Sequence, residues 1–208
     1  MAYNHMHDIL AELASHNKRV FSINDAAKAM GKSKRYATKL LSSNKEVERI
    51  ERGKYYIKTS NPDIYEIASQ IIYPSYISAF AALQFYSVVE QSVVKYTVIT
   101  IKRHKQIRVM GNVIEFVTVP KNRFFGYKKE GNAYIATIEK AIVDSLYLRS
   151  PPYSYVSEAF NIAARNKILN IYLLRDFALR MGSKKVVLQI ESLLKANGFS
   201  TRHMHNKK

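Results

Sequence analysis

Four polar side chains in a short basic stretch have types and spacing suited to contact with a polyanion. They follow Ser33 within two turns of a predicted helix and lie away from its apolar residues: Lys34, Arg35, Thr38 and Lys39. Lysine and arginine donate hydrogen bonds to phosphate oxygens, and arginine can also bind guanine through two parallel hydrogen bonds. Side chains near the start of a helix are the ones that usually meet base edges.

Two predicted helices joined by a glycine turn would position this basic face. Ser22 can cap a helix that starts at Ile23, because its hydroxyl can accept a backbone N–H of the first turn. Gly31 then supplies the positive φ that a tight turn between helices needs. Ser33 is the expected cap of the second helix, whose apolar positions are Ala37, Leu40 and Leu41.

A basic hairpin is predicted after the second helix. Two β-prone runs, residues 46–50 and 55–57, flank a turn at Gly53. Its cations, together with Ser33, are expected at the DNA backbone or in the minor groove: Arg49, Arg52 and Lys54. Two helices followed by a hairpin are typical of a winged helix-turn-helix, which lays one helix in the DNA major groove. The alternative is a small helical domain with a solvated charged face and a surface hairpin.

The charge of the whole chain favours the same class of partner. The formal net charge is +17 and the pI is near 9.9. Residues 1–60 carry +6, residues 61–160 carry +3 and residues 161–208 carry +8. Such a surplus indicates a polyanionic partner. Nucleic acid fits better than a membrane, because neither a lipidation signal nor a Trp/Phe-rich amphipathic helix accompanies the charge.

Composition excludes several other classes. The chain has no cysteine, which rules out disulfides, thiolate metal sites and a cysteine nucleophile. No apolar run reaches the roughly 18 residues that a bilayer span needs, and the first ten residues lack the order of a signal peptide. Five of the six histidines lie near the two ends without carboxylates nearby, so no metal site is expected. We expect a cytoplasmic protein that needs no cofactor.

The middle of the chain predicts helices followed by a sheet. Residues 59–63 read as a linker, and residues 64–73 as a helix. Ser75 is expected to cap a second helix that runs through Leu83 and Phe85. β-branched and aromatic runs then predict an antiparallel sheet of four or five strands from residues 93–101, 106–109, 112–119, 124–127 and 132–136.

The remainder predicts helices. Thr137 is expected to cap the first, Pro151-Pro152 to interrupt the chain, and three more to follow at residues 154–165, 171–181 and 183–196. The sequence thus predicts an α+β fold with four parts. They are a winged helix-turn-helix domain (1–60), an α+β domain (61–150), a helical extension packed on it (151–200) and a basic tail (201–208), which we expect to be disordered.

Catalysis in the middle domain is the competing hypothesis. Its acidic candidates are Glu115, Glu139 and Asp144. Glu139 and Asp144 are five residues apart, about 500° of helical rotation, so they do not share one face squarely. Two-metal chemistry needs several convergent carboxylates. We therefore expect Glu139 to favour a helix N-terminus, Asp144 to pair with a basic neighbour, and the protein not to be an enzyme. A metal-dependent nuclease or another nucleic-acid enzyme is the alternative.

Several of the fifteen tyrosines could stack on bases or lie beside phosphates: Tyr55, Tyr56, Tyr73, Tyr76 and Tyr86. Most are spaced as core residues of strands or helices, and a buried tyrosine is stable when its hydroxyl finds a partner. We expect these side chains to belong to the core.

Four segments occur in the order and spacing of AbiEi-type proteins. They are PSYISAFAALQFYSVVEQ (74–91), YTVITIKR (96–103), FFGY (124–127) and YIATIEKAIVDSLYLR (134–149). The most characteristic parts are Tyr76-Ile77-Ser78 and Glu139-Lys140-Ala141 with Asp144. The hairpin sequence Arg52-Gly53-Lys54-Tyr55 also resembles the family's Arg-Gly-x-Tyr.

AbiEi-type proteins are the antitoxin and transcriptional regulator components of type IV toxin–antitoxin and abortive-infection systems. The resemblance implies a winged helix that binds operator DNA, and a C-terminal domain that supports antitoxin action beside a neighbouring nucleotidyltransferase toxin. We therefore expect a sequence-specific regulator that represses its own operon. Double-stranded operator DNA is the expected partner; a cognate toxin and a second copy of the chain are further candidates, and a membrane is not expected. A third possibility is an antitoxin whose winged helix serves only for dimerisation.

Overall fold

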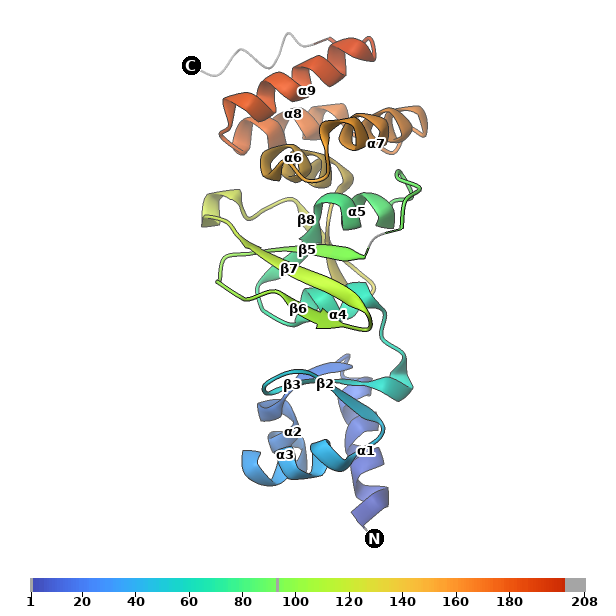
Figure 1. Cartoon of the computed structure of the whole chain (residues 1–208), viewed down its shortest axis with the longest axis vertical. Helices are drawn as coiled ribbons and strands as arrows, with labels where there is room; N and C mark the ends of the chain where they lie inside the picture. The colour runs from blue at the N-terminus through green and yellow to red at the C-terminus, as the bar shows by residue number, and fades with distance from the viewer. Residues whose placement is uncertain (1, 93, 201–208) are drawn as a thin grey trace.

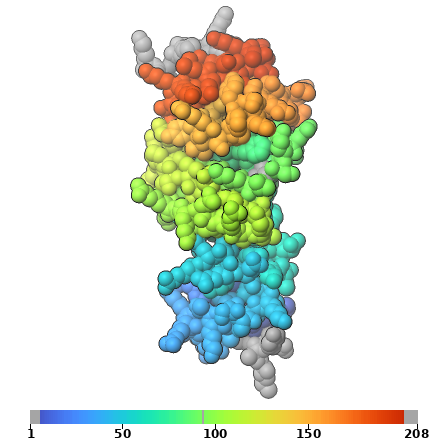
Figure 2. Space-filling view, in the orientation of Figure 1, coloured from blue at the N-terminus to red at the C-terminus, as the bar shows by residue number. Residues whose placement is uncertain are grey.

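The computed structural model of the chain describes residues 2–92 and 94–200. It is elongated, with an N-terminal unit at one end, a sheet in the middle and a layer of helices at the other end (Figure 1). The space-filling view narrows where the N-terminal unit, in blue, meets the green part of the chain (Figure 2). The division into domains stays a prediction.

The N-terminal unit comprises α1 (Ala2–Ser15), β1 (Val20–Ser22), α2 (Ile23–Met30), α3 (Lys34–Ser43), β2 (Val47–Glu51) and β3 (Lys54–Ile57). Its three strands pair antiparallel in the order β1-β3-β2. Apolar residues of α1, α2 and α3 pack against the sheet around Phe21 and Ile57, each 2% exposed. This separate core gives the short helices a fixed surface to pack on, since isolated helices of this length are marginal in water.

The predicted caps and turns of this unit are confirmed. The Ser22 side chain accepts a hydrogen bond from the backbone N–H of Asp25, whose carboxylate accepts one from the Ser22 N–H, which forms a capping box. Gly31 ends α2 at a φ of 59°. Ser33 caps α3 by accepting from the backbone N–H of Tyr36. Gly53 turns the hairpin at a φ of 78°.

The second unit begins after η1 (Lys58–Ser60) with α4 (Ile64–Gln70), which Asp63 caps. Next come β4 (Ser75–Ser78), α5 (Ala79–Phe85), β5 (Lys95–Thr100), β6 (Ile107–Val109), β7 (Asn112–Thr118), η2 (Lys121–Arg123), β8 (Tyr127–Glu130) and β9 (Ala133–Ala136). Within the described residues these strands form one six-stranded sheet in the order β6-β7-β5-β4-β9-β8. α4 lies on the side that faces the N-terminal unit, and α5 lies on the other (Figure 1).

The prediction of an antiparallel sheet is wrong. β5 pairs with β7 in parallel, and β4 pairs with β9 in parallel, whereas the β4–β5, β6–β7 and β8–β9 pairs are antiparallel. A parallel pair needs a crossover connection. Here β6 and its loops lie between β5 and β7, and the whole segment from α5 to β8 lies between β4 and β9. The alternation of apolar and polar residues within a strand does not indicate which distant strand will pair with it, or in which direction.

Two local predictions are also wrong. Ser75 does not cap a helix: Ser75–Ser78 is strand β4, buried at all four residues, and helix α5 starts at Ala79. The edge strand β8 is Tyr127–Glu130, not residues 124–127, so Lys128 and Lys129 lie in a strand and not between two strands as expected. Lysine is common on edge strands because it discourages pairing with another chain.

Helices α6 (Ile138–Leu148), α7 (Tyr153–Arg165), α8 (Ile171–Arg180) and α9 (Lys184–Ala196) complete the described chain. Thr137 caps α6 as predicted. Apolar residues of all four helices share one core with Tyr76, Ile99 and Ile135 of the sheet. The predicted basic tail, residues 201–208, lies outside the described residues. Among the described helices, none is long and apolar enough to span a bilayer.

Candidate nucleic-acid interface

A groove of about 290 Å³ separates α3 from the β2–β3 hairpin. It is lined by Ile23, Lys34, Arg35, Thr38, Arg49, Arg52, Gly53 and Tyr55. Five of the eight predicted DNA-contact residues are therefore in one place: three come from α3 and two from the hairpin. No carboxylate lines the groove, so its charged lining is cationic throughout.

Packing on one side of α3 determines which side chains remain outside. Ala37 and Leu41 are buried against the N-terminal core, at 0% and 3% exposed. Lys34, Arg35 and Lys39 are consequently exposed on the remaining faces of the helix. The hydroxyl of Thr38, also exposed, donates a 2.8 Å hydrogen bond to the backbone carbonyl of Lys34.

The hairpin is held to the helices at its turn and along its buried face. The backbone N–H of Ile23 donates a 2.8 Å hydrogen bond to the carbonyl of Gly53, which ties the hairpin turn to the first residue of α2. Tyr55 is buried and stacks on Phe21 at a ring distance of 5.8 Å. Arg49 Nε donates to the Glu51 carbonyl at 3.1 Å, across a register irregularity in β2. The hairpin that forms one side of the groove is thus held in place by a backbone hydrogen bond and by a buried ring contact.

Three of the predicted contact residues do not line the groove. The Ser33 hydroxyl is used as the cap of α3. Lys39 is exposed one turn further along the helix, and Lys54 is half-buried where β3 pairs with β1. Sequence position alone could not separate Lys54 from Arg52, because the boundary between the turn, which holds Arg52, and β3, which holds Lys54, depends on how the strands pair.

Acidic side chains close to the hairpin are engaged elsewhere. The Tyr56 hydroxyl donates a 2.8 Å hydrogen bond to Glu48, and burial, together with this bond, raises the pKa of Tyr56 to about 12. Glu51 Oε1 lies 3.1 Å from Nε2 of His104. These contacts hold Glu48 beside Tyr56 of β3, and Glu51 beside His104, rather than against the cations of the groove.

The contact between Glu51 and His104 also brings further cations close to the hairpin. His104 belongs to the loop between β5 and β6, in which Lys102, Arg103 and Lys105 are exposed. We did not single out these residues from the sequence. The run IKRHK at residues 101–105 is the signal that could have found them. Their position extends the basic surface from the N-terminal unit onto the second unit.

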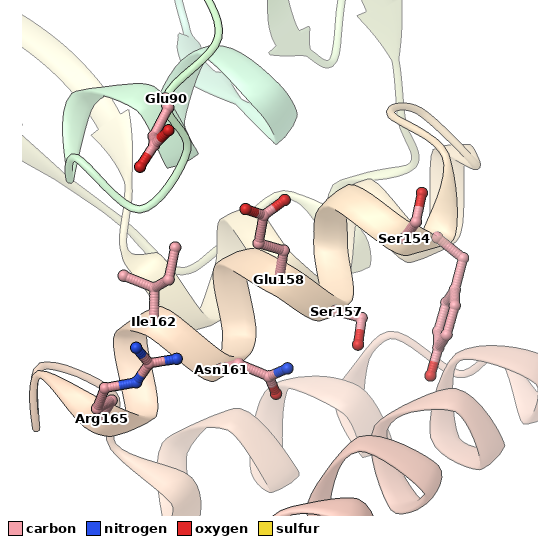
Figure 3. Close-up of a pocket in the computed structure, with 8 residues that line it drawn as sticks. Glu90, Ser154, Ser157, Glu158, Asn161, Ile162 and Arg165 are labelled. Atoms are coloured by element: carbon pink, nitrogen blue, oxygen red, sulfur yellow. The ribbon is translucent and has the colours of Figure 1, made fainter.

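A second hollow, of about 580 Å³, lies at the opposite end of the chain, beside α7 (Figure 3). Glu90 faces α7 from the loop after α5, while Glu158, Asn161 and Arg165 come from α7 itself. Its serine hydroxyls, Ser154 and Ser157, have no histidine among the lining residues to act as a base. The lining therefore lacks a serine–histidine pair for nucleophilic catalysis. Because it contains both acidic and basic side chains, it is also not suited to bind a polyanion.

The three acidic candidates for nuclease chemistry each have a separate partner. Glu115 pairs with Lys95 at 2.8 Å, and Glu139 accepts a 2.9 Å hydrogen bond from the backbone N–H of Asn170. Asp144 pairs with Lys140, as expected. Burial raises the pKa of Asp144 against the opposing effect of Lys140, and burial lowers the pKa of Lys140. Within the described residues, no group of three or more His, Asp or Glu side chains is arranged to hold a metal ion.

The core assignment of the tyrosines is confirmed for Tyr55, Tyr56 and Tyr76, which are at most 5% exposed. It is wrong for Tyr73, which is 71% exposed. Tyr73 follows α4 and precedes Pro74, where a turn carries the side chain out of the apolar layer.

Comparison with known proteins identifies the segment that contains the groove. Residues 8–58 match the model of a family described as transcriptional regulator, AbiEi antitoxin. No curated protein matches the chain. The match spans about a quarter of the 208 residues and includes all of α2, α3, β2 and β3. The segments after residue 58 that resemble AbiEi-type proteins lie outside it. Residues 8–58 are therefore similar to the AbiEi antitoxin family of transcriptional regulators.

Proposed function

We propose that this protein is a sequence-specific DNA-binding regulator that represses its own operon and acts as the antitoxin of a type IV toxin–antitoxin pair. The family match supports a role as regulator and antitoxin. The observation that carries DNA binding is the groove between α3 and the hairpin, in which four cations and one threonine converge without a carboxylate.

In this proposal the N-terminal unit is a winged helix-turn-helix. α3 enters the major groove with Lys34 and Arg35 near its first turn, where a recognition helix meets base edges. Arg35 reads a base, and Arg49 and Arg52 on the hairpin bind phosphates or enter the minor groove. The exposed cations beside His104 would then contact the backbone next to the hairpin, because the Glu51–His104 contact holds their loop there.

The decisive experiment is fluorescence anisotropy with duplex DNA from upstream of the gene and with a scrambled duplex of the same composition. Both are titrated across a salt series. A preference of about 10³-fold or more for the upstream duplex, with a log–log salt slope that corresponds to about 5–8 phosphates, supports a specific regulator. Equal affinity and equal slope for both duplexes would show a general polyanion surface and would reject sequence-specific repression.

Antitoxin action needs a separate test. We propose a nucleotidyltransferase toxin encoded beside this gene as its target, and a cytoplasmic site of action, because the proposed operator is there. Co-expression should restore growth to cells that make the toxin. Arg35→Ala should still restore growth if neutralisation does not depend on operator binding. If the wild-type protein fails to rescue under conditions in which it is produced folded, the antitoxin part of the proposal is rejected.

We propose further that the protein acts without catalysis of its own. Support comes from the three acidic candidates, each of which is held by a different partner. Cleavage of DNA or RNA that depends on a divalent metal and disappears in Glu139→Ala would contradict this proposal. A folded Glu139→Ala variant with unchanged spectroscopic signature is the necessary control, because Glu139 also binds the start of α8.

A further inference from the structure

A hollow of about 430 Å³ lies between the N-terminal unit and the second unit. One wall is the turn between α1 and β1, with His16, Asn17 and Lys18. The facing wall combines the end of α4 with the β8–β9 hairpin. Hollows that hold small molecules usually measure about 300–1,000 Å³ and often occur where two units meet. The size and place of this hollow are therefore those of a ligand site.

The second unit contributes a cation and two aromatic rings. Lys129 and Tyr134 are paired across the β8–β9 hairpin and so lie on the same face of the sheet. The Tyr134 ring is 6.5 Å from that of Tyr73, which is largely exposed. Among the described residues, the Lys129 ammonium and the two tyrosine hydroxyls make no hydrogen bond or ion pair, although the charge of Lys129 acts on the Glu66 carboxylate and opposes the rise in its pKa that burial causes. They are available to a ligand.

The remaining lining groups are mostly neutral hydrogen-bonding side chains. Asn17, Gln70 and Asn132 provide amides, and the Gln70 nitrogen is held by a 2.8 Å hydrogen bond to the Asn132 carbonyl. The one carboxylate, Asp25, is already bonded to Lys18 and to Ser22. The lining thus has a formal charge of +1, from Lys18 and Lys129 against Asp25, with histidine neutral. That balance favours an anion of low charge that also has a planar, hydrogen-bonding part.

We propose that this hollow binds a nucleoside monophosphate. The base stacks on the exposed ring of Tyr73 beside Tyr134, and its edge is bonded by the amides. The phosphate is bound by Lys129 and by the protons of Lys18 that Asp25 does not use. A base is suited to this wall because every base has a face that stacks on an aromatic ring. Because the walls come from both units, the occupied site joins them beside the Arg19–Glu66 ion pair.

Isothermal titration calorimetry with the full chain tests this site, with AMP, adenosine and inorganic phosphate as separate probes. We expect AMP to bind with a Kd below about 1 mM and more tightly than adenosine or phosphate. Tyr73→Ala should weaken AMP binding by about fivefold to a hundredfold, the range for loss of one stacking partner. Tyr73 is exposed, so this variant keeps its core.

Two neighbouring lysines of β8 allow the contribution of charge to AMP binding to be tested with a matched control. Lys129 lines the hollow, whereas its neighbour Lys128 points to the other face, where it pairs with Glu130 at 2.5 Å. Lys129→Ala should weaken AMP binding, and Lys128→Ala should leave it unchanged. Absence of heat up to 2 mM AMP, equal binding of phosphate and AMP, or equal losses in the two lysine variants would each overturn the proposal. No DNA is used, so this outcome is independent of operator binding.

Discussion

Lys140 Nζ lies 2.5 Å from Asp144 Oδ1, one helical turn apart on α6, and the two side chains are 0% and 2% exposed. The other carboxylate oxygen of Asp144 accepts hydrogen bonds from the Ser78 hydroxyl at 2.7 Å and the Tyr76 hydroxyl at 3.2 Å. The two most characteristic motifs of the resemblance beyond residue 58 thus meet in one buried network. Their contact is internal, between the sheet and the first of the C-terminal helices.

Removal of one charge from this pair should be far more harmful than removal of both. Lys140→Met leaves a buried carboxylate without its cation and should lower the free energy of unfolding by about 3–5 kcal/mol. The double variant Lys140→Met/Asp144→Leu should recover a large part of that loss, because no uncompensated charge remains. Urea unfolding of Lys140→Met, Asp144→Leu and the double variant measures the difference. A double variant less stable than either single variant would contradict this account.

Gly126→Ala should destabilise the loop before β8. A Cβ atom there would lie 2.8 Å from Phe177 Cε2 and 3.1 Å from Lys140 Cβ, and the backbone has a φ of 73°. Gly131→Ala is the matched control, because its φ is 57° but nothing lies within 4 Å of its Cβ position. We expect a loss of about 1–3 kcal/mol beyond that of Gly131→Ala, from overpacking. Equal melting temperatures for the two variants would show that the contact with Phe177 relaxes freely.

Asp25 should make the N-terminal unit sensitive to acid. Burial opposes its ionisation, but hydrogen bonds from Lys18 and Ser22 prevail and lower the pKa of Asp25 from its ordinary value of 3.8 to about 2. A lowered pKa in the folded state gives stability that is present above pH 4 and lost as the pH falls towards 2. Asp25→Asn should therefore cost about 1–2 kcal/mol at pH 7 and little at pH 2.

Thermal unfolding of the wild type and Asp25→Asn from pH 7 to pH 2 measures this effect. Asp8→Asn, at an exposed position on α1, is the control for charge removal without a capping bond. We expect the melting temperatures of the wild type and Asp25→Asn to become equal at low pH. A difference in melting temperature between the two proteins that stays constant down to pH 2 would show that the stability difference is not linked to ionisation of the Asp25 carboxylate.

Arg35 and Arg52 should differ in how they affect DNA binding. Arg35→Ala should reduce the preference for the upstream duplex, since a base contact contributes about 1–3 kcal/mol of discrimination. Arg52→Ala should weaken binding to upstream and scrambled duplexes alike and reduce the salt slope by about 1. Arg165 is exposed on α7, away from the groove, so Arg165→Ala should change neither the affinity for the two duplexes nor the salt slope. Equal losses on both duplexes for Arg35→Ala would remove Arg35 from base recognition.

Local signals in the sequence were sufficient to predict the helix caps and turns of the N-terminal unit. Ser22, Gly31, Ser33 and Gly53 each act within a few residues of their own position, and the structure confirms all four. The groove could also be predicted in part, because the cations of a helix and of the following hairpin are close in sequence. The different exposure of Arg52 and Lys54 could not be predicted, since it depends on how β3 pairs with both of its neighbours.

The second unit was harder to predict because the order of its strands is set by pairing between segments that are far apart in the sequence. Tyr76-Ile77-Ser78 has the composition of either a helix or a strand. It becomes a strand because β5 and β9 both pair with it. The hollow between the two units was missed for the same reason. Lys129 and Tyr134 were unremarkable in the sequence, and only the approach of the α1–β1 turn gives them a facing wall.

The position of β4 in the sheet also determines the order in which the chain can fold during synthesis. Every strand of the N-terminal unit finds its partner within residues 20–57, so that unit can fold as soon as it leaves the ribosome. One edge of β4 stays open until β9 has been made, because Ile77 pairs with Ile135. Chains that end before Ala136 therefore expose an apolar strand edge, and such fragments should aggregate even though the proposed DNA-contact surface has already formed.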